Sequence, residues 1–155
     1  MNYNINGTVD GDTIVDFSSL DGKVHELINA AIKVRNNAYC PYSKFAVGAA
    51  LRAKTGEIFT GCNVENGTFG PSVCAERTAL CKAISEGHRE FEAIAVVAYQ
   101  ETHFTTPCGT CRQSLAEFCP KDLRIYVAKP SPARVMVTSL QKLLPHAFMP
   151  NFLRE

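Results

Sequence analysis

Cys74, Cys108 and Cys111 stand at the starts of two predicted helices, and they restrict the possible folds more than any other residues of the chain. Each of these helix starts follows a loop that leaves a predicted strand. The exposed backbone N–H groups and the macrodipole at a helix start favour thiolate over thiol, and so favour metal binding. We therefore expect the fold to gather the three thiolates around one zinc ion.

The apolar periodicity predicts the elements that carry these cysteines. A first helix follows a cap at Ser18 or Ser19, and Pro41 ends its apolar pattern. The other predicted elements are a hairpin of two strands (45–51 and 58–64), a helix (75–86), a buried strand (91–99), a helix (109–118), a strand (124–128), a loop (129–133) and a short helix (138–144). This order predicts an α/β fold, a single-domain mixed β-sheet with helices packed on its faces. Residues 1–18 are expected to form a loose N-terminal extension, and residues 19–155 the catalytic domain.

Composition narrows the class of protein further. A chain of 155 residues that is 46% hydrophobic matches one ordinary domain. Its net charge is +1 without a basic run that could follow a phosphate backbone, so we expect no nucleic-acid partner. No apolar stretch reaches the roughly 18 residues that span a bilayer, and no export signal opens the sequence. We expect a cytoplasmic protein with no membrane partner, whose seven cysteines are thiols or metal ligands.

Three protein ligands leave one of the four tetrahedral positions of zinc open for water, which distinguishes a catalytic site from a closed structural one. Zinc lowers the pKa of such a water from about 15.7 toward 7. Glu76 lies two residues beyond Cys74, where it can handle protons without binding the metal, so we assign it as the acid–base group. Arg77 and Arg112 are positioned to offset the negative charge of the three thiolates.

Two other interpretations fit parts of this pattern. A lone C-x-x-C between a strand and a helix is also typical of a thioredoxin-like redox motif, although a redox pair needs neither Cys74 nor Glu76. A closed structural zinc would need a fourth ligand, for which the candidates are Cys62, Cys81, His88 and His103. The cysteines outside the cluster are expected to be small buried residues; they are Cys40, Cys62, Cys81 and Cys119.

From about residue 25 to 150, the chain resembles the small, homotetrameric, three-cysteine cytidine deaminases. Four motifs carry the resemblance, in order: Tyr42-Ser-Lys-Phe-Ala-Val-Gly-Ala-Ala-Leu51, Gly61-Cys-Asn-Val-Glu-Asn66, Cys74-Ala-Glu-Arg-Thr-Ala-Leu80 and Pro107-Cys-Gly-Thr-Cys-Arg-Gln113. The resemblance implies one zinc per subunit and hydrolytic deamination in pyrimidine salvage. Glu76 would take a proton from the zinc-activated water, which attacks C4 of cytosine, and would then pass protons to N3 and to the departing amine. Uridine and ammonia would result.

The resemblance also implies a nucleoside site. Asn63 and Glu65 would bind the ribose 3′-hydroxyl as donor and acceptor, which favours cytidine or deoxycytidine. Phe45 would pack on the pyrimidine, unless it is plain core, and the backbone at Ala75 would hydrogen-bond the base. The remaining two site residues, Phe69 and Phe148, would be lent to the site of a neighbouring subunit. Phe69 departs from the family, where many relatives carry a tyrosine, and this puts sugar affinity and subunit coupling in question.

Three other functions share the metal motifs. A blasticidin-type deaminase would not need the ribose pair Asn63 and Glu65. A nucleic-acid-editing deaminase would need basic and aromatic residues leading to the site, and the sequence does not provide them. A zinc-stabilised binding protein without turnover would not need Glu76.

Overall fold

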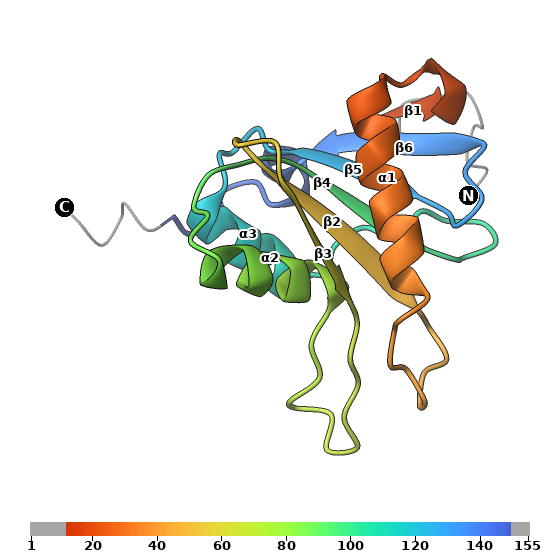
Figure 1. Ribbon diagram of the computed structural model, residues 1–155, viewed down its shortest axis with the longest axis vertical. Helices are drawn as coiled ribbons and strands as arrows, with labels where there is room; N and C mark the ends of the chain where they lie inside the picture. Colours follow the sequence, from red (N-terminus) through yellow and green to blue (C-terminus); the bar gives the residue numbers. More distant parts are fainter. Residues whose placement is uncertain (1–11, 150–155) are drawn as a thin grey trace.

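A computed structural model describes residues 12–149 and contains one six-stranded sheet with helices on both faces (Figure 1). The strand order is β1-β6-β5-β4-β2-β3, and only the β4–β5 pair is parallel. The expected α/β fold with a mixed sheet is therefore confirmed. The elements are β1 (Thr13–Asp16), the 3-10 helix η1 (Phe17–Ser19), α1 (Gly22–Arg35), β2 (Val47–Ala53), β3 (Ile58–Cys62), α2 (Ala75–Ser85), β4 (Phe91–Ala98), α3 (Gly109–Phe118), β5 (Arg124–Ala128), β6 (Arg134–Ser139) and α4 (Leu140–Leu143).

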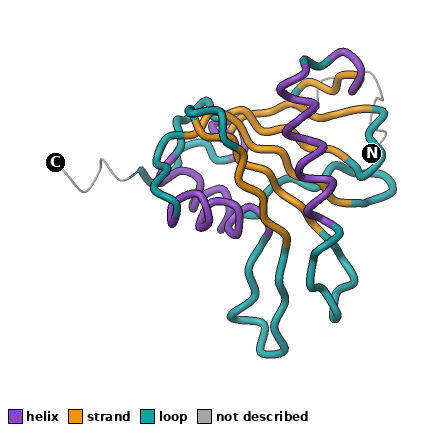
Figure 2. Tube along the Cα trace, viewed as in Figure 1, coloured by secondary structure: helices purple, strands orange, loops and turns teal. Residues whose placement is uncertain are grey.

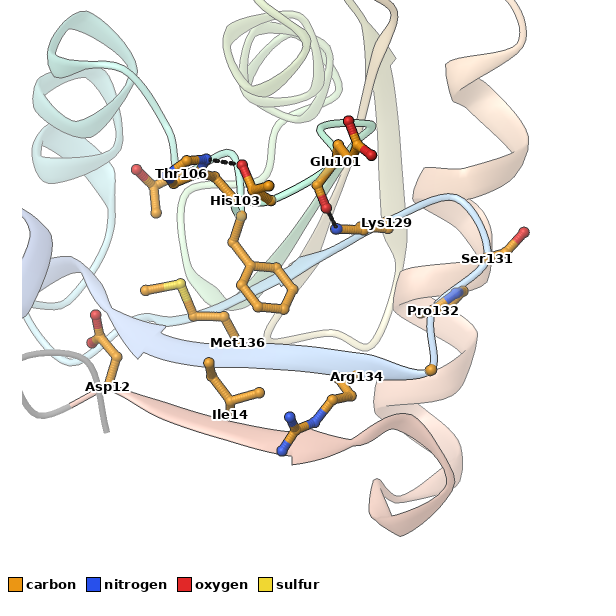
Figure 3. Close-up of a pocket in the computed structure, with 13 residues that line it drawn as sticks. Asp12, Ile14, Glu101, His103, Thr106, Lys129, Ser131, Pro132, Arg134 and Met136 are labelled. Carbon is orange, nitrogen blue, oxygen red and sulfur yellow. Dashed lines mark hydrogen bonds between the residues drawn. The ribbon is translucent and has the colours of Figure 1, made fainter. Parts of the chain in front are cut away.

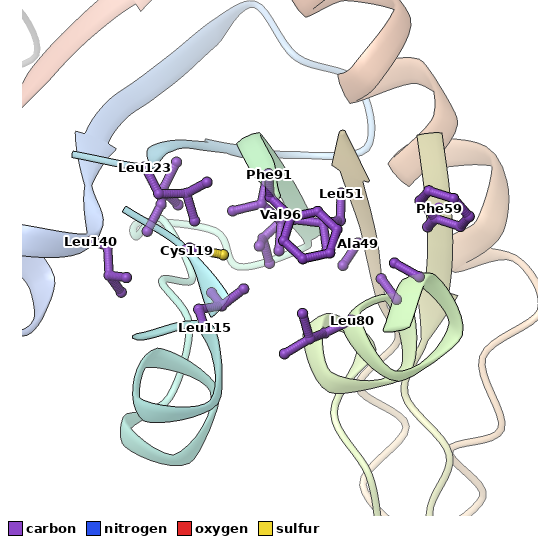
Figure 4. Close-up of a cluster of buried hydrophobic side chains, with 14 of the residues drawn as sticks. Ala49, Leu51, Phe59, Leu80, Phe91, Val96, Leu115, Cys119, Leu123 and Leu140 are labelled. Carbon is purple, nitrogen blue, oxygen red and sulfur yellow. The ribbon is translucent and has the colours of Figure 1, made fainter. Parts of the chain in front are cut away.

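The sheet is buried on both faces, which makes it the centre of a three-layer domain. Helix α1 packs on one face, and α2 and α3 pack on the other (Figures 1 and 2). Alternate residues of β4 serve the two layers: Ile94 and Val96 join the α2–α3 core, while Ala95 and Val97 join the α1 core. Figure 4 shows the α2–α3 core, in which Phe91 is fully buried. Strands buried on both faces read as continuous apolar runs, which is why β4 is plain in the sequence.

Two glycines let the helices approach the sheet closely. A Cβ at Gly48 would lie 2.1 Å from the backbone oxygen of Ala31 in α1. A Cβ at Gly61 would lie 2.4 Å from the backbone nitrogen of Ala79 and 2.5 Å from the backbone oxygen of Ala75, both in α2. Any larger residue at Gly61 would push α2 away from β3, and α2 begins directly after Cys74.

The expectation of a loose extension over residues 1–18 is wrong for the part that the structure describes. Thr13–Asp16 forms β1, which pairs antiparallel with β6, and η1 follows it. Asp21, not Ser18 or Ser19, caps α1, because its carboxylate accepts a 2.9 Å hydrogen bond from the N–H of Val24. Residues 1–11 lie outside the described part.

The carboxy-terminal elements also differ from expectation. Residues 134–139 form β6, a strand that the apolar pattern does not predict, and the last helix begins at Leu140 instead of residue 138. Ser139 caps this helix by accepting from the N–H of Lys142. No helix within residues 12–149 is long and apolar enough to cross a membrane.

Candidate active site

The three predicted metal ligands meet at one point between the starts of α2 and α3. Cys74 and Cys108 are the N-cap residues of these helices, and Cys111 lies in the first turn of α3. The Sγ atoms of Cys74 and Cys108 are 3.9 Å apart, and those of Cys108 and Cys111 are 3.5 Å apart. All three sulfurs lie within 4.8 Å of one another, a spacing that one metal ion can bridge.

The donor set fits zinc better than the alternatives. Soft thiolate ligands in a compact cluster select zinc over magnesium or calcium, which prefer oxygen. Within the described residues no fourth histidine, cysteine or carboxylate joins the cluster. His88 instead lies 3.1 Å from a carboxylate oxygen of Glu57, and the ring of His103 bonds the hydroxyl of Thr102. The cluster therefore offers three protein ligands among the described residues, which is the number that a catalytic zinc site uses.

The pKa values of two cysteines in the cluster are shifted in opposite directions. The pKa of Cys74 is lowered to about 5, chiefly by the hydrogen bond from the Cys111 thiol and further by Cys108 and Arg77, against the effect of burial. The pKa of Cys111 is raised because its thiol donates that hydrogen bond and because it is buried. The contacts within the cluster therefore favour the thiolate form at Cys74.

Glu76 is buried beside this cluster, at 5% exposure, in the first turn of α2. Burial raises the pKa of its carboxyl group, and the negative charge of Cys74 raises it further. A carboxyl group with a raised pKa accepts a proton more readily than an ordinary carboxylate does, which suits an acid–base role.

The two arginines occupy different positions. Burial acts to lower the pKa of the Arg77 guanidinium, but the neighbouring Cys74 outweighs this effect and raises it. Arg77 also donates to the backbone oxygen of Ser72 at 3.2 Å. Arg112 donates to the backbone oxygens of Pro107 and Leu143, at 2.6 and 2.7 Å, and to the hydroxyl of Thr106. Arg112 thus fixes the loop before Cys108, and its role in offsetting the thiolate charge stays a prediction.

The predicted nucleoside residues lie on two loops that extend together beyond the sheet (Figure 1). One loop joins α1 to β2 and the other joins β3 to α2, and Tyr39 pairs with Val64 between them. The side-chain amide of Asn63 donates to the backbone oxygen of Phe45 and accepts from the N–H of Val47, both at 2.8 Å. Phe45 is half-buried and lies outside the two core clusters.

Three further residues are predicted to contact the substrate: Ala75, Phe69 and Phe148. Ala75 is buried at the first position of α2. The ring of Phe69 is 73% exposed and meets Tyr42 edge-on at 6.2 Å, while Phe148 is 56% exposed. Both of these residues are more than half exposed. Of the cysteines outside the cluster, Cys119 is buried as expected, whereas Cys81 is exposed because it lies on the outer side of α2.

Sequence reasoning missed Ser43, which contacts Glu65 through both its hydroxyl and its backbone N–H. The motif that begins at Tyr42 contains Ser43, but only the fold shows which residue it meets. A cavity of about 540 Å³ lined by Asp12, Phe104 and Met136, among others, also has no sequence signal (Figure 3). None of the three cluster cysteines lines it.

The fold and the cluster define a mixed-sheet α/β protein in which three cysteines at two helix starts could hold a metal ion. The chain belongs to the cytidine and deoxycytidylate deaminase family, because residues 22–127 match the model of its zinc-binding region. This range contains all three cysteines and Glu76, whereas β1 and β6 lie outside it.

Named relatives agree with this membership. The cytidine deaminase of Sporosarcina psychrophila is 49% identical over 125 residues, which are 81% of this chain and 90% of that protein. The crystal structure of a cytidine deaminase from Burkholderia pseudomallei matches with a TM-score of 0.75 and 47% identity, covering 80% of this chain and 98% of that one. A blasticidin-S deaminase of Bacillus cereus is 29% identical over 116 residues, covering 70% of this chain and 81% of that protein.

Proposed function

We propose that this protein is a zinc-dependent cytidine deaminase that converts cytidine, and deoxycytidine, to the uridine forms plus ammonia. The observation that carries the proposal is the juxtaposition of three clustered thiols with the buried carboxyl group of Glu76. A structural zinc site needs no such carboxyl group. The names of the close relatives support the same substrate.

Cys74, Cys108 and Cys111 would hold one zinc ion per subunit. When bound, zinc supplies a Lewis acid that brings the pKa of water toward 7. Glu76 accepts a proton from the water that attacks C4 of the pyrimidine and passes it to N3; it then takes the second proton from the hydroxyl group formed at C4 and passes it to the departing amine. Arg77 offsets the sulfur charge through Cys74.

Asn63 and Glu65 would select a nucleoside through its 3′-hydroxyl, while Phe45 packs on the ring and the backbone at Ala75 bonds the base. This ribose pair, and the higher identity to cytidine deaminases, favour cytidine over a blasticidin-type substrate. The same assignment implies a small-molecule substrate and a role in pyrimidine salvage. It also implies that the protein acts in the cytoplasm, without a nucleic-acid or membrane partner.

The exposed rings of Phe69 and Phe148 support assembly into a homotetramer in which subunits share sites. An exposed aromatic ring gains most when another surface covers it. Closed symmetric assemblies are the common outcome for soluble chains that self-associate.

The direct test is the absorbance change of cytidine deamination by metal-analysed protein. Turnover with about one zinc per chain is expected, and X-ray absorption should count three sulfurs and one lighter atom around the metal. Four sulfurs, or protein purified without chelator that holds no metal, would contradict the catalytic assignment.

The sugar assignment has its own test. Cytidine should be a far better substrate than free cytosine, and Glu65→Ala should erode that preference. Glu57→Ala is the matched control, because Glu57 is an exposed carboxylate that lies next to His88 instead of the substrate loops. Equal rates on base and nucleoside by the natural chain would refute the assignment.

A further inference from the structure

The hydroxyl of Ser43 links the two residues that the proposed function assigns to the base and the sugar. It accepts a 3.0 Å hydrogen bond from the backbone N–H of Phe45. It donates its own proton to a carboxylate oxygen of Glu65. Because the Phe45 N–H can only donate, the hydroxyl proton of Ser43 must point at Glu65. The two hydrogen bonds therefore run in one fixed direction, from Phe45 through Ser43 to Glu65.

Glu65 receives further donors from the same turn. Its Oε2 atom accepts from the backbone N–H groups of Tyr42 and Ser43, at 3.0 and 3.2 Å. An ionised carboxylate offers about four lone-pair positions, and these three hydrogen bonds occupy three of them. One acceptor position is left, which is the number that a single sugar hydroxyl needs.

The turn itself requires these contacts. Lys44, between Ser43 and Phe45, has a φ of +59°, in the left-handed region that residues with a side chain seldom adopt. Such a conformation persists only where the surroundings hold it. Glu65 holds the turn at Tyr42 and Ser43, and the Asn63 amide holds it at Phe45 and Val47.

The charge state of Glu65 follows from the same contacts. The hydrogen bond from Ser43 is the largest cause of its lowered pKa, and the backbone N–H groups of Tyr42 and Ser43 and the charge of Lys44 add to it against the effect of burial. With its pKa lowered from 4.5, Glu65 remains an acceptor at mildly acid pH.

We propose that Ser43 is a positioning residue for nucleoside recognition, which sets the Glu65 carboxylate and the Phe45 ring in one fixed relation. Sugar and base are then gripped by a single preorganised unit, so the cost of ordering the loop is already met before substrate binds. This inference rests on the proposed roles of Glu65 and Phe45.

The test compares Ser43→Ala, Ser43→Thr and the natural chain in cytidine deamination. A hydrogen bond to a charged group is worth enough to predict a rise in KM of about 10- to 100-fold for Ser43→Ala, with kcat within about twofold. Ser43→Thr, which keeps the hydroxyl group, should bring KM most of the way back to the value of the natural chain. Turnover of free cytosine, which lacks the sugar, should be slowed less by Ser43→Ala than turnover of cytidine.

The pH profile separates positioning from a general loss of structure. Without Ser43 the pKa of Glu65 should return upward, so the KM of Ser43→Ala should worsen further as the pH falls from 6 toward about 4.5. The matched control is Thr55→Val, which removes a similar hydroxyl contact, 3.2 Å from a carboxylate oxygen of Glu57, on the β2–β3 turn. It should change neither KM nor its pH dependence.

A double-mutant cycle makes the outcome decisive. If Ser43 acts through Glu65, adding Ser43→Ala to Glu65→Ala should raise KM little beyond Glu65→Ala alone. Additive effects, an unchanged KM in Ser43→Ala, or a fall in kcat alone would overturn the inference while leaving the deaminase assignment intact. Ser43→Cys, which keeps the size of the side chain but is a much weaker hydrogen-bond donor, replaces Ser43→Ala if the latter loses zinc or melts early. A natural chain without cytidine turnover would overturn the proposed function and this inference together.

Discussion

The side-chain amide of Gln113 donates a 2.7 Å hydrogen bond to the backbone oxygen of Phe148. Gln113 lies two residues beyond Cys111, and its neighbour Arg112 bonds the backbone oxygen of Leu143. The helix that begins with Cys108 and Cys111, two of the proposed metal ligands, therefore holds the carboxy-terminal segment at two points. Two hydrogen bonds thus connect the helix start that carries the cysteines to the segment that carries Phe148.

If Phe148 completes a neighbouring site, activity depends on assembly through mass action. Phe148→Ala should weaken association, and its specific activity should fall on dilution at concentrations where the natural chain is still active. Sedimentation velocity and assays over one concentration range check this. Tyr99→Ala is the control, because that ring is 60% exposed on a different loop. A fully active monomer would show that each site is complete within one chain.

Replacing Glu76 should remove proton transfer and leave the metal in place. Glu76→Gln keeps the size of the side chain, so the fold and the zinc content should persist. The value of kcat should fall by at least about 10² to 10⁴-fold, the usual worth of a positioned acid–base group. Glu86→Gln, at the exposed end of the same helix, should stay fully active. Near-normal kcat in Glu76→Gln, measured with metal analysis, would remove Glu76 from the mechanism.

Gly61 should be needed for both stability and metal binding. In Gly61→Ala the new methyl group would meet the backbone of α2 at 2.4 Å, so β3 and α2 must separate. We expect a loss of about 1 to 3 kcal/mol in the free energy of unfolding, typical of overpacking, and weaker zinc retention against a chelator. Gly22→Ala is the control, since no atom lies within 4 Å of the Cβ it would add. Equal stability of the two variants would mean that α2 adjusts freely.

Cys119 should be chemically inert in the folded protein. Burial raises the pKa of its thiol from 9.0 to about 12, so between these pH values the unfolded chain releases a proton that the folded chain retains. Stability is therefore lost as pH rises through that window. At pH 9, iodoacetamide should modify the exposed Cys81 quickly and Cys119 only on unfolding, as peptide mass spectrometry can follow. Equal modification rates in folded protein would contradict the burial of Cys119.

Each half of the three-cysteine cluster could be predicted from the sequence because each half is a local feature of a helix start; the fold then joins the halves across 34 positions. Cys74 and Cys108 are N-cap residues of helices with clear apolar patterns, and a helix start has the same chemistry in any fold. Strand β4 could also be predicted, because a strand that is buried on both faces has a continuous run of apolar residues in the sequence.

The parts that were missed depend on partners far away in the sequence. β1 is four residues long and becomes a strand only through β6, whose residues pair with it from more than 110 positions away. Such short segments carry little intrinsic preference, so tertiary pairing decides. The contact of Ser43 with Glu65 likewise joins two loops 22 residues apart. A motif can mark both residues without showing that one holds the other.

The pairing of β1 with β6 has a consequence for how the protein behaves in solution. Without β1, the outer side of β6 would present unpaired N–H and C=O groups along a strand that includes Val135 and Met136, and such an edge is a template for another chain. β1 shields that edge with a short strand bounded by Asp16, whose charge discourages further strand addition. A chain shortened past Asp16 would keep the three proposed metal ligands and Glu76. It would nevertheless expose the edge of β6, and we expect it to aggregate edge to edge.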